Sequence, residues 1–345
     1  MSKNTLFVPA RYYMRLADLV AERGFEIAPL LRTLNLPIQS LAEPDAQVSW
    51  AQVESLLAKL RILTGRSDLG FELGKLLTVS AHSIVGFGML NNPNVEDALR
   101  FLAQYFSLVM PSFRMQYIAG EDFGELQFSP TTPMSEECLA FHVEAIGMAA
   151  LREVRDLASD RRFRVQLHIA IPPPPHASRY GLIPDLETEF HAEFGAVVRL
   201  RCMVCLHTIP LAAADKNALK VAEEHCRLLV QKIIKVGGFA DLIAITLSGA
   251  SKAPLSEDEV AAMFNISKRT LVRNLQREKT SFRAITRQVL HDTARQRLLV
   301  STMSITQVSY SLGFRDTSNF TRAFRNVEGC SPSEFRRRAT SSGFE

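Results

Sequence analysis

The chain has 345 residues, of which 47% are hydrophobic and 22% charged, so it is long enough for two domains and apolar enough to exclude wholesale disorder. Its five cysteines do not make a disulfide framework, and their odd number favours a reducing compartment. The net charge of +4 is uneven, because residues 251–345 hold 16 Lys and Arg against 9 Asp and Glu, whereas residues 1–250 hold 24 against 27. The basic end fits a polyanion-binding domain, although a solvated charged surface would give the same asymmetry.

The N-terminal part of the chain is predicted to be helical. Residues 1–11 lack the basic start and apolar core of a signal peptide, and no apolar run reaches the roughly 18 residues that suggest a membrane span. We therefore expect a cytoplasmic protein without a membrane partner. Apolar residues recur at 3.6-residue spacing in Tyr12–Arg23, Trp50–Leu63 and Asn94–Leu108, which predicts three helices.

Strand patterns appear after these helices. Phe113–Ile118 and Glu125–Phe128, joined across Gly120–Gly124, predict a hairpin. Further strands are predicted at Arg164–Ile171 and Ala196–Leu206, and further helices at Glu136–Leu157 and Asp215–Lys235. This mixture predicts an α+β N-terminal domain over residues 1–235. A linker is expected at residues 236–254, where Gly237–Gly238 and Ser248–Pro254 enclose a short apolar segment.

Residues 255–345 are predicted to form an all-α domain. Ser256 and Ser267 are expected to cap helices that run to Phe264 and to about Glu278. A long helix is predicted over Phe282–Val300, and a shorter one begins after Ser304. The last pattern starts at a cap, Asp316 or Thr317, and runs to about Val327, with Phe335 packing back on the core.

One helix-turn-helix pattern occurs twice in this domain. The first copy consists of Val260, Phe264, Leu271, Arg273 and Leu275, and the second of Val308, Leu312, Phe320, Arg322 and Phe324. Each copy predicts a helix pair that buries an apolar seam and turns a cationic face outward. Two such faces in tandem are typical of a protein that reads double-stranded DNA.

The polar residues of the two patterns suit base and phosphate contacts. Arg269 and Arg273 are four residues apart, and a guanidinium can bond O6 and N7 of guanine together. In the second copy, Thr317, Ser318, Thr321 and Arg322 are expected to face outward. The alternative is that these arginines only solubilise a helix, and this alternative stays open for Lys268 and Arg277, which flank the first pair.

Several motifs resemble the DNA-binding domain of AraC/XylS-type bacterial transcription regulators. They are Ser267–Arg273 (SKRTLVR), Ile305–Phe314, Asn319–Arg325 (NFTRAFR) and Gly329–Arg336 (GCSPSEFR), and the resemblance spans about residues 253–338. It implies seven helices, two reading helices in successive major grooves, direct repeats in promoter DNA, and RNA polymerase as a partner. It places base contacts at Arg269, Val272, Arg273, Thr317, Ser318, Thr321 and Arg322. Lys279 stands where glycine is frequent, so either the turn differs or Lys279 adopts a positive φ at some cost.

The front domain is similar to the "arabinose-binding" N-terminal domain of one branch of that family. The similarity spans about residues 20–235 and lies in Gly86–Leu90, Asn94–Leu108, Ile171–His176, Glu193–Ala196 and Pro210–Leu211. It implies that the domain senses a small effector, which the domain's name does not identify as a sugar, and that it self-associates as a homodimer.

Other signals favour packing rather than chemistry. Cys202, Cys205 and His207 have metal-like spacing, but they lie on an apolar strand pattern without a second ligand pair, so buried cysteine is the better interpretation. We expect no metal and no cofactor. The scattered histidines His82, His142, His168, His176 and His191 favour core or surface positions, and Phe87, Met89, Phe101, Tyr105, Met110 and Phe113 favour core over an effector pocket. The sequence thus predicts a transcription regulator and not an enzyme; an enzyme and a ligand-free architectural protein are the alternatives.

Overall fold

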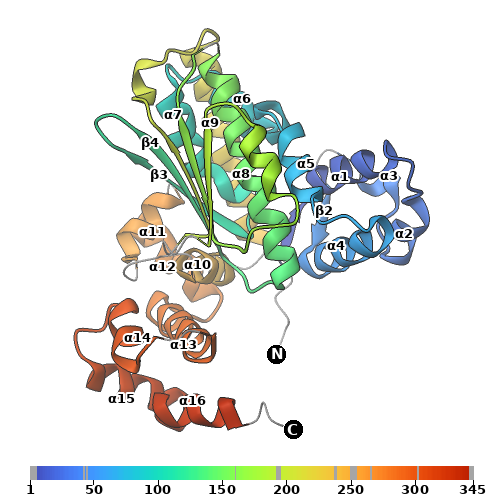
Figure 1. The fold of residues 1–345 in the computed structure, drawn as a ribbon. Coiled ribbons are helices and arrows are strands. Elements are labelled where there is room, and N and C mark those ends of the chain that lie inside the picture. Colours follow the sequence, from blue (N-terminus) through green and yellow to red (C-terminus); the bar gives the residue numbers. More distant parts are fainter. Residues whose placement is uncertain are drawn as a thin grey trace. The chain divides into compact units, whose positions relative to one another are not determined.

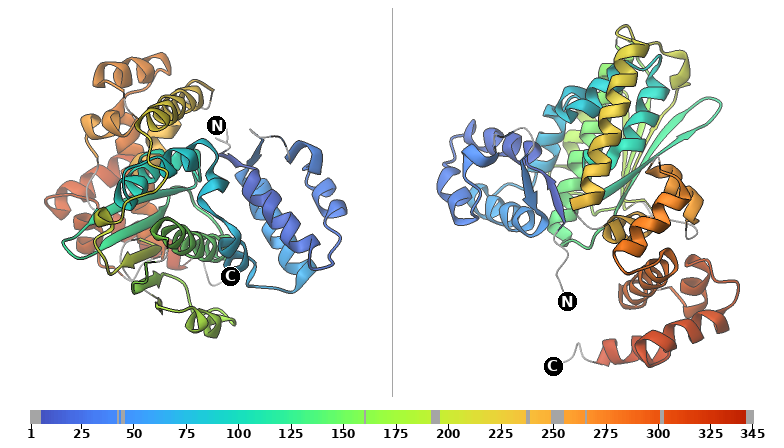
Figure 2. Two further views of the ribbon diagram at one scale, coloured as in Figure 1. Left: turned by 90° about the horizontal axis from the view of Figure 1, so that it is seen from above. Right: turned by 180° about the vertical axis from the view of Figure 1, so that it is seen from behind.

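The computed structural model describes residues 6–41, 43, 46–159, 161–191, 196–236, 239–248, 255–264, 266–300 and 303–341. Two compact units divide the chain, residues 1–230 and residues 231–345. Figure 1 shows the ribbon, and Figure 2 adds two views. Residues 193–195 of the Glu193–Ala196 motif, and residues 237–238 and 249–254 of the expected linker, lie outside the described residues.

The first unit begins with a helical region that holds a two-stranded ribbon. β1 (Phe7–Pro9) pairs antiparallel with β2 (Gln47–Ser49). The helices here are α1 (Arg11–Ala21), α2 (Ala28–Thr33), α3 (Ile38–Leu41) and α4 (Trp50–Thr64), so α1 and α4 confirm two predicted helices. The helices α2 and α3 were not predicted, because six residues or fewer are too short to display a 3.6-residue period.

A five-stranded sheet in the order β3-β4-β7-β5-β6 forms the centre of the first unit. The strands are β3 (Phe113–Ala119), β4 (Gly124–Pro130), β5 (Val165–Ile169), β6 (Leu186–Phe190) and β7 (Val198–Cys202). β3 and β4 form the predicted hairpin, with Phe113 opposite Pro130. Burial alternates along β5 and β7, so one face of each strand points into the core. Cys202 is part of that inner face, and burial raises the pKa of its thiol to about 12.

Helices pack on this sheet and on one another. They are α5 (Leu69–Leu76), α6 (Ile84–Leu90), α7 (Val95–Tyr105), α8 (Glu136–Ala158) and α9 (Lys216–Val236), with short 3₁₀ turns η1 (Val79–His82), η2 (Phe106–Leu108), η3 (Ala177–Leu182) and η4 (Leu206–Thr208). The predicted helix Asn94–Leu108 is α7 with its last turn tightened into η2. α8, the long helix in front of the sheet in Figure 1, contacts α5, β5 and β7 and so joins the helical layer to the sheet.

The second unit is a set of helices arranged around one long central helix. They are α10 (Phe239–Ser248), α11 (Glu257–Met263), α12 (Lys268–Arg277), α13 (Phe282–Val300), α14 (Ile305–Ser311), α15 (Thr317–Glu328) and α16 (Pro332–Ser341). α10 lies inside the expected linker 236–254, yet its apolar face packs on α13 and Phe239 stacks edge-on with Phe264. This part of the expected linker is therefore a core element of the second unit. No described helix is long and apolar enough to cross a membrane.

Candidate nucleic-acid interface and ligand cavity

The first helix-turn-helix pair is formed by α11 and α12. Ser267 caps α12, because its hydroxyl accepts a hydrogen bond of 3.1 Å from the backbone N–H of Thr270. Val260, Phe264, Leu271 and Leu275 are all buried, as the repeated pattern predicts. Arg273, between the last two of these, is exposed on the surface of α12.

Arg269, Arg273 and Arg277 present a cationic face on α12. All three side chains are exposed, and among the described residues none of their guanidinium groups forms an ion pair. Val272 is half-buried beside them. Since no ion pair has to be broken first, these guanidinium groups are available to bind phosphate or a base edge.

Lys268, at the start of α12, differs from these arginines. Its ammonium lies 3.0 Å from a carboxylate oxygen of Asp258 and 3.4 Å from one of Glu257, both in the first turn of α11. The hydrogen bond to Asp258 is the main cause of a raised pKa of Lys268. A phosphate contact by Lys268 would therefore compete with two carboxylates of the protein itself.

The second pair is formed by α14 and α15, and side chains also cap both of its helices. The side chain of Asp316, and not that of Thr317, caps α15 by accepting a bond of 2.7 Å from the N–H of Asn319. Phe320 and Phe324 belong to a core cluster that also contains Val308 and Leu312. The ring of Phe335 packs on Phe324 at 5.5 Å between centroids, so the expected return of α16 to the core is confirmed.

The predicted contact residues of α15 lie on its solvent side to different degrees. Ser318 and Arg322 are exposed, whereas Thr317 and Thr321 are half-buried. The guanidinium of Arg322 donates a 3.0 Å hydrogen bond to the side-chain oxygen of Asn319, one turn earlier. This bond holds Arg322 along the helix surface, and the remaining donors of its guanidinium have no partner among the residues that the structure describes.

α13 connects the two pairs and takes part in both cores. Ile285 and Val289 are buried in its first half, which packs on α10, whereas Ala294 and Leu298 belong to the second core cluster. The turn before α13 contains Lys279 with φ 56°, so the sequence position where glycine is frequent does adopt the left-handed conformation. Gly313, after α14, has φ 81° as expected for a helix end.

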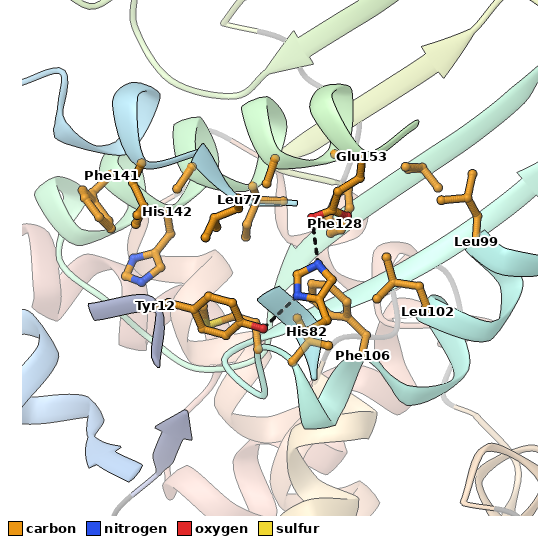
Figure 3. A pocket seen from close by; sticks show the side chains of 18 of the residues that line it. Tyr12, Leu77, His82, Leu99, Leu102, Phe106, Phe128, Phe141, His142 and Glu153 are labelled. Atoms are coloured by element: carbon orange, nitrogen blue, oxygen red, sulfur yellow. Dashed lines mark hydrogen bonds and ion pairs between the residues drawn. The ribbon is translucent and has the colours of Figure 1, made fainter. Parts of the chain in front are cut away.

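A cavity of about 60 Å³ lies inside the first unit (Figure 3). Leucine, phenylalanine, alanine and other apolar side chains from α5, α7, α8 and β4 make most of its wall. Polar groups reach it from Tyr12, Tyr13, His82, His142 and Glu153. Of the six residues considered from the sequence for an effector pocket, Met110 lines this cavity, whereas Phe87 is 45% exposed and the other four are buried in the core without lining it.

One polar chain in the wall of the cavity runs from Tyr12 through His82 to Glu153. Nε2 of His82 lies 2.7 Å from a carboxylate oxygen of Glu153, and Nδ1 lies 2.9 Å from the hydroxyl of Tyr12. The three residues are between 3% and 5% exposed. Burial acts against a charged imidazole, but the Glu153 carboxylate outweighs it and raises the pKa of His82 to about 10. His82 and Glu153 thus form a buried ion pair.

A second histidine in the wall, His142, is uncharged. Burial lowers the pKa of His142 to about 4, so its imidazole is neutral at pH 7. Its Nδ1 lies 2.7 Å from the backbone oxygen of Cys138, and its Nε2 lies 3.0 Å from the hydroxyl of Tyr13. Since a carbonyl can only accept, Nδ1 carries the proton and Nε2 accepts from Tyr13.

Two other histidines, His168 and His176, lie beside carboxylates of the fold, whereas His191 is exposed. His168 pairs with Glu189 across β5 and β6, and His176 pairs with the buried Glu144, which also accepts a bond from the Tyr180 hydroxyl. Cys205 is half-buried. Tyr12 and Glu153 were not singled out from the sequence, because neither belongs to a local motif; helical periodicity alone placed both on amphipathic helices.

Comparison with known proteins gives a family match within each of the two units. Residues 24–203 match the family described as "Arabinose-binding domain of AraC transcription regulator, N-term", and residues 260–338 match a "Helix-turn-helix domain" family. The chain is 27% identical to the Ornithine utilization regulator of Pseudomonas aeruginosa over 95% of this chain and 96% of that protein. It is 36% identical to the Transcriptional activator NphR of Rhodococcus sp over 25% of each chain.

Among solved structures, that of the transcriptional regulator CdpR from Pseudomonas aeruginosa covers 89% of this chain and 97% of its own, with 22% identity and a TM-score of 0.44. The family match over residues 24–203 includes half of the chain, and the relatives are transcription regulators rather than enzymes. An N-terminal ligand domain is thus joined to a helix-turn-helix DNA-binding domain. The chain belongs to the AraC-type transcription regulators whose N-terminal domain is of the arabinose-binding type.

Proposed function

We propose that this regulator binds promoter DNA by placing α12 and α15, its two reading helices, in successive major grooves. The observation that supports this most is the repeated position of an exposed arginine between two buried residues, which are Leu271 and Leu275 around Arg273 and Phe320 and Phe324 around Arg322. α13, which joins the two pairs, has 19 residues and is therefore about 28 Å long. That length is comparable to the roughly 34 Å between grooves on one face of DNA.

The proposed contacts divide into base readout and phosphate binding. Base contacts are assigned to Arg269, Val272, Arg273, Thr317, Ser318, Thr321 and Arg322, and phosphate contacts to Lys268 and Arg277. Val272 offers an apolar surface alone, which suits a thymine methyl group. The phosphate contacts make affinity fall steeply with salt, whereas the base contacts decide which sequence is bound.

Single substitutions on the two reading helices test this proposal. Arg273→Ala or Arg322→Ala is expected to weaken binding to the cognate promoter by about 1–3 kcal/mol and to relax the preference for one base pair. Arg283→Ala is the matched control, because Arg283 is an exposed arginine of the same unit that lies on α13. Each variant would be titrated with cognate and random duplexes at several salt concentrations. An equal loss on both duplexes for Arg273→Ala and Arg322→Ala would refute base readout.

We further propose that each subunit occupies direct repeats about one helical turn apart, and that the regulator acts in the cytoplasm as a homodimer that contacts RNA polymerase. The family membership supports each of these partners. A footprint with two protected major grooves per subunit, together with a dimer mass in analytical ultracentrifugation, is the expected result. A single short footprint would contradict the arrangement of two reading helices.

We also propose that a small molecule bound to the first unit controls DNA binding. The alternative is an architectural protein without a ligand. A specific ligand raises the unfolding temperature of the unit that binds it as its concentration increases. Concentration-dependent thermal shifts with a metabolite panel therefore separate a sensor from an architectural protein, and a panel without any shift favours the latter.

A further inference from the structure

The two reading helices can be compared position by position, because Arg273 of α12 corresponds to Arg322 of α15. In this register, the third residue before the arginine is Thr270 in α12 and Asn319 in α15. Residues three apart lie on the same face of a helix, so each of them is within reach of its arginine. The exchange of threonine for asparagine is therefore a difference on the face that is proposed to read DNA.

Asn319 forms hydrogen bonds with both ends of its side-chain amide. Its Nδ2 donates to a carboxylate oxygen of Asp316 at 2.5 Å, and its Oδ1 accepts from the guanidinium of Arg322 at 3.0 Å. An ionised carboxylate only accepts and a guanidinium only donates, so the opposite orientation of the amide would break both bonds. The donors and acceptors of these three side chains thus have a single arrangement.

Asp316 is itself held at the start of α15. Its other carboxylate oxygen accepts from the backbone N–H of Asn319 at 2.7 Å, which is the N-cap bond of the helix. Both oxygens of Asp316 are therefore bonded to Asn319, one to the backbone and one to the side chain. The hydrogen bonds that end on Arg322 begin at the capped end of the helix backbone.

The corresponding hydrogen bonds in α12 stop before the arginine. The hydroxyl of Thr270 lies 2.9 Å from that of Ser267, which caps the helix. Arg273 has no hydrogen-bond partner among the residues that the structure describes. Arg273 therefore loses its rotamer freedom only when it binds a base, whereas the freedom of Arg322 is already reduced in the unbound protein.

We propose that Asn319 and Asp316 are positioning residues that hold the guanidinium of Arg322 in place for one base pair, a device that α12 lacks. This inference rests on the proposed binding of α15 in a major groove. Asn319 uses one of the five donors of Arg322, and the other four are sufficient for O6 and N7 of guanine. Asn319 reads no base itself, because its bidentate contact to adenine would need the same amide oxygen and nitrogen.

Asn319→Thr tests the proposal, since it gives α15 the residue that α12 has at this position. The full chain would first select its preferred duplex from a randomised library, and Arg322→Ala would identify the base pair that Arg322 reads. Discrimination is the ratio of the dissociation constants of the duplex substituted at that base pair and the preferred duplex. Asn319→Thr is expected to lower this ratio about 2- to 10-fold, because the arginine then has to be immobilised when it binds the preferred base. Discrimination at the base pairs read by α12 should not change.

Asp316→Ser tests the other end of the hydrogen-bonded chain. Serine keeps the helix cap, as Ser267 does in α12, but lacks the oxygen that holds the amide of Asn319. Discrimination is expected to fall in this variant also. Asn326→Thr is the control, because it makes the same exchange at an exposed asparagine of α15 without a hydrogen-bonded side chain among the described residues, and it should keep the discrimination of the parent. Circular dichroism would verify that all variants keep their helices.

A double variant separates positioning from direct contact. When Asn319→Thr is added to Arg322→Ala, no further change at this base pair is expected, because Asn319 acts only through the arginine. A further loss would show that Asn319 contacts the base itself, and unchanged discrimination in Asn319→Thr alone would show that Arg322 needs no positioning. Either result overturns this proposal and leaves DNA recognition by Arg322 intact. If Arg322→Ala itself alters no base preference, the proposed function of α15 fails as well.

Discussion

The backbone of Gly74 in α5 lies against the carbonyl oxygen of Ala145 in α8 so closely that a Cβ on Gly74 would stand 2.4 Å from that oxygen. One turn earlier, a Cβ on Gly70 would stand 2.2 Å from the carbonyl oxygen of Phe141. Two glycines four residues apart thus allow two helix backbones to touch. Ala145 and Phe141 both line the cavity, so this close approach fixes one of its walls.

Gly74→Ala is expected to lower the free energy of unfolding of the first unit by about 1–3 kcal/mol, because the backbone of α8 has to move away. Gly181→Ala is the control, since Gly181 is exposed and a Cβ on it would meet no atom within 4 Å. That change should alter the free energy by less than about 1 kcal/mol. Urea unfolding followed by Trp50 fluorescence measures both, and equal stability of the two variants would contradict the close packing.

The neutral His142 makes the first unit sensitive to acid. Its folded-state pKa of about 4 lies below the ordinary 6.5, so the unfolded chain binds more protons between these values. Stability from this residue is complete above pH 6.5 and is lost as the pH falls toward 4, by about 3 kcal/mol in total. The raised pKa of His82, about 10, affects stability in a different pH range. The contribution of His82 to stability is complete below pH 6.5 and is lost as the pH rises through 10.

His142→Gln should remove this acid sensitivity, because the amide offers a donor and an acceptor but does not titrate. Unfolding of the variant and of the parent would be compared between pH 4 and 6.5 with Trp50 fluorescence, whose indole lies 5.1 Å from the His142 ring. His225→Gln changes an exposed histidine of α9 and serves as the control. If the two variants have the same pH profile, His142 is not the group responsible.

Lys279 holds a left-handed conformation that glycine adopts without a Cβ penalty. Lys279→Gly is therefore expected to stabilise the second unit by about 1 kcal/mol, despite the greater freedom of glycine in the unfolded chain. Lys279→Ala removes the same charge but keeps the backbone strain, so it should bring no gain. Slower hydrogen exchange of the amides in α12 and α13 for the glycine variant alone is the expected observation.

The ion pair of Lys268 with Asp258 should restrain binding to DNA in general. Asp258→Asn is expected to free this lysine for a phosphate, which raises affinity for cognate and random duplexes alike and steepens the dependence of log K on log salt by up to about 0.9. Asp292→Asn removes an exposed carboxylate of α13 that is paired with no lysine or arginine among the described residues, so its effect should be smaller. Unchanged affinity for both duplexes in Asp258→Asn would contradict a restraint of Lys268 by this ion pair.

The two helix-turn-helix pairs of the second unit could be predicted in detail because the residues that define each helix lie close together in the sequence. Periodic apolar residues and side-chain caps define α12, α13 and α15 to within a residue or two, and the exposure of Arg273 and Arg322 follows from the same period. Asp316 could not be chosen over Thr317 as the cap, since both residue types accept from a backbone N–H.

The cavity could not be predicted because its polar groups come from distant parts of the chain. Tyr12 and His82 are 70 positions apart, and His82 and Glu153 are 71 apart. β6 was also missed, because its five residues LETEF hold only two apolar side chains, Leu186 and Phe190, and its parallel pairing with β5 is a tertiary property. The position of such residues depends on how α1, η1 and α8 pack.

The 19-residue helix α13 links the binding of the two helix pairs to DNA. Because both helix pairs are built on this one rod, docking of the first pair holds the second at a high effective concentration beside the next groove. If the two pairs occupy successive grooves as proposed, we expect affinity for a complete double site to far exceed that for either half alone, and promoters with a single half-site to stay vacant at the same protein concentration. Inserting half a helical turn between the halves would turn the second groove to the opposite side of the duplex and cancel this gain.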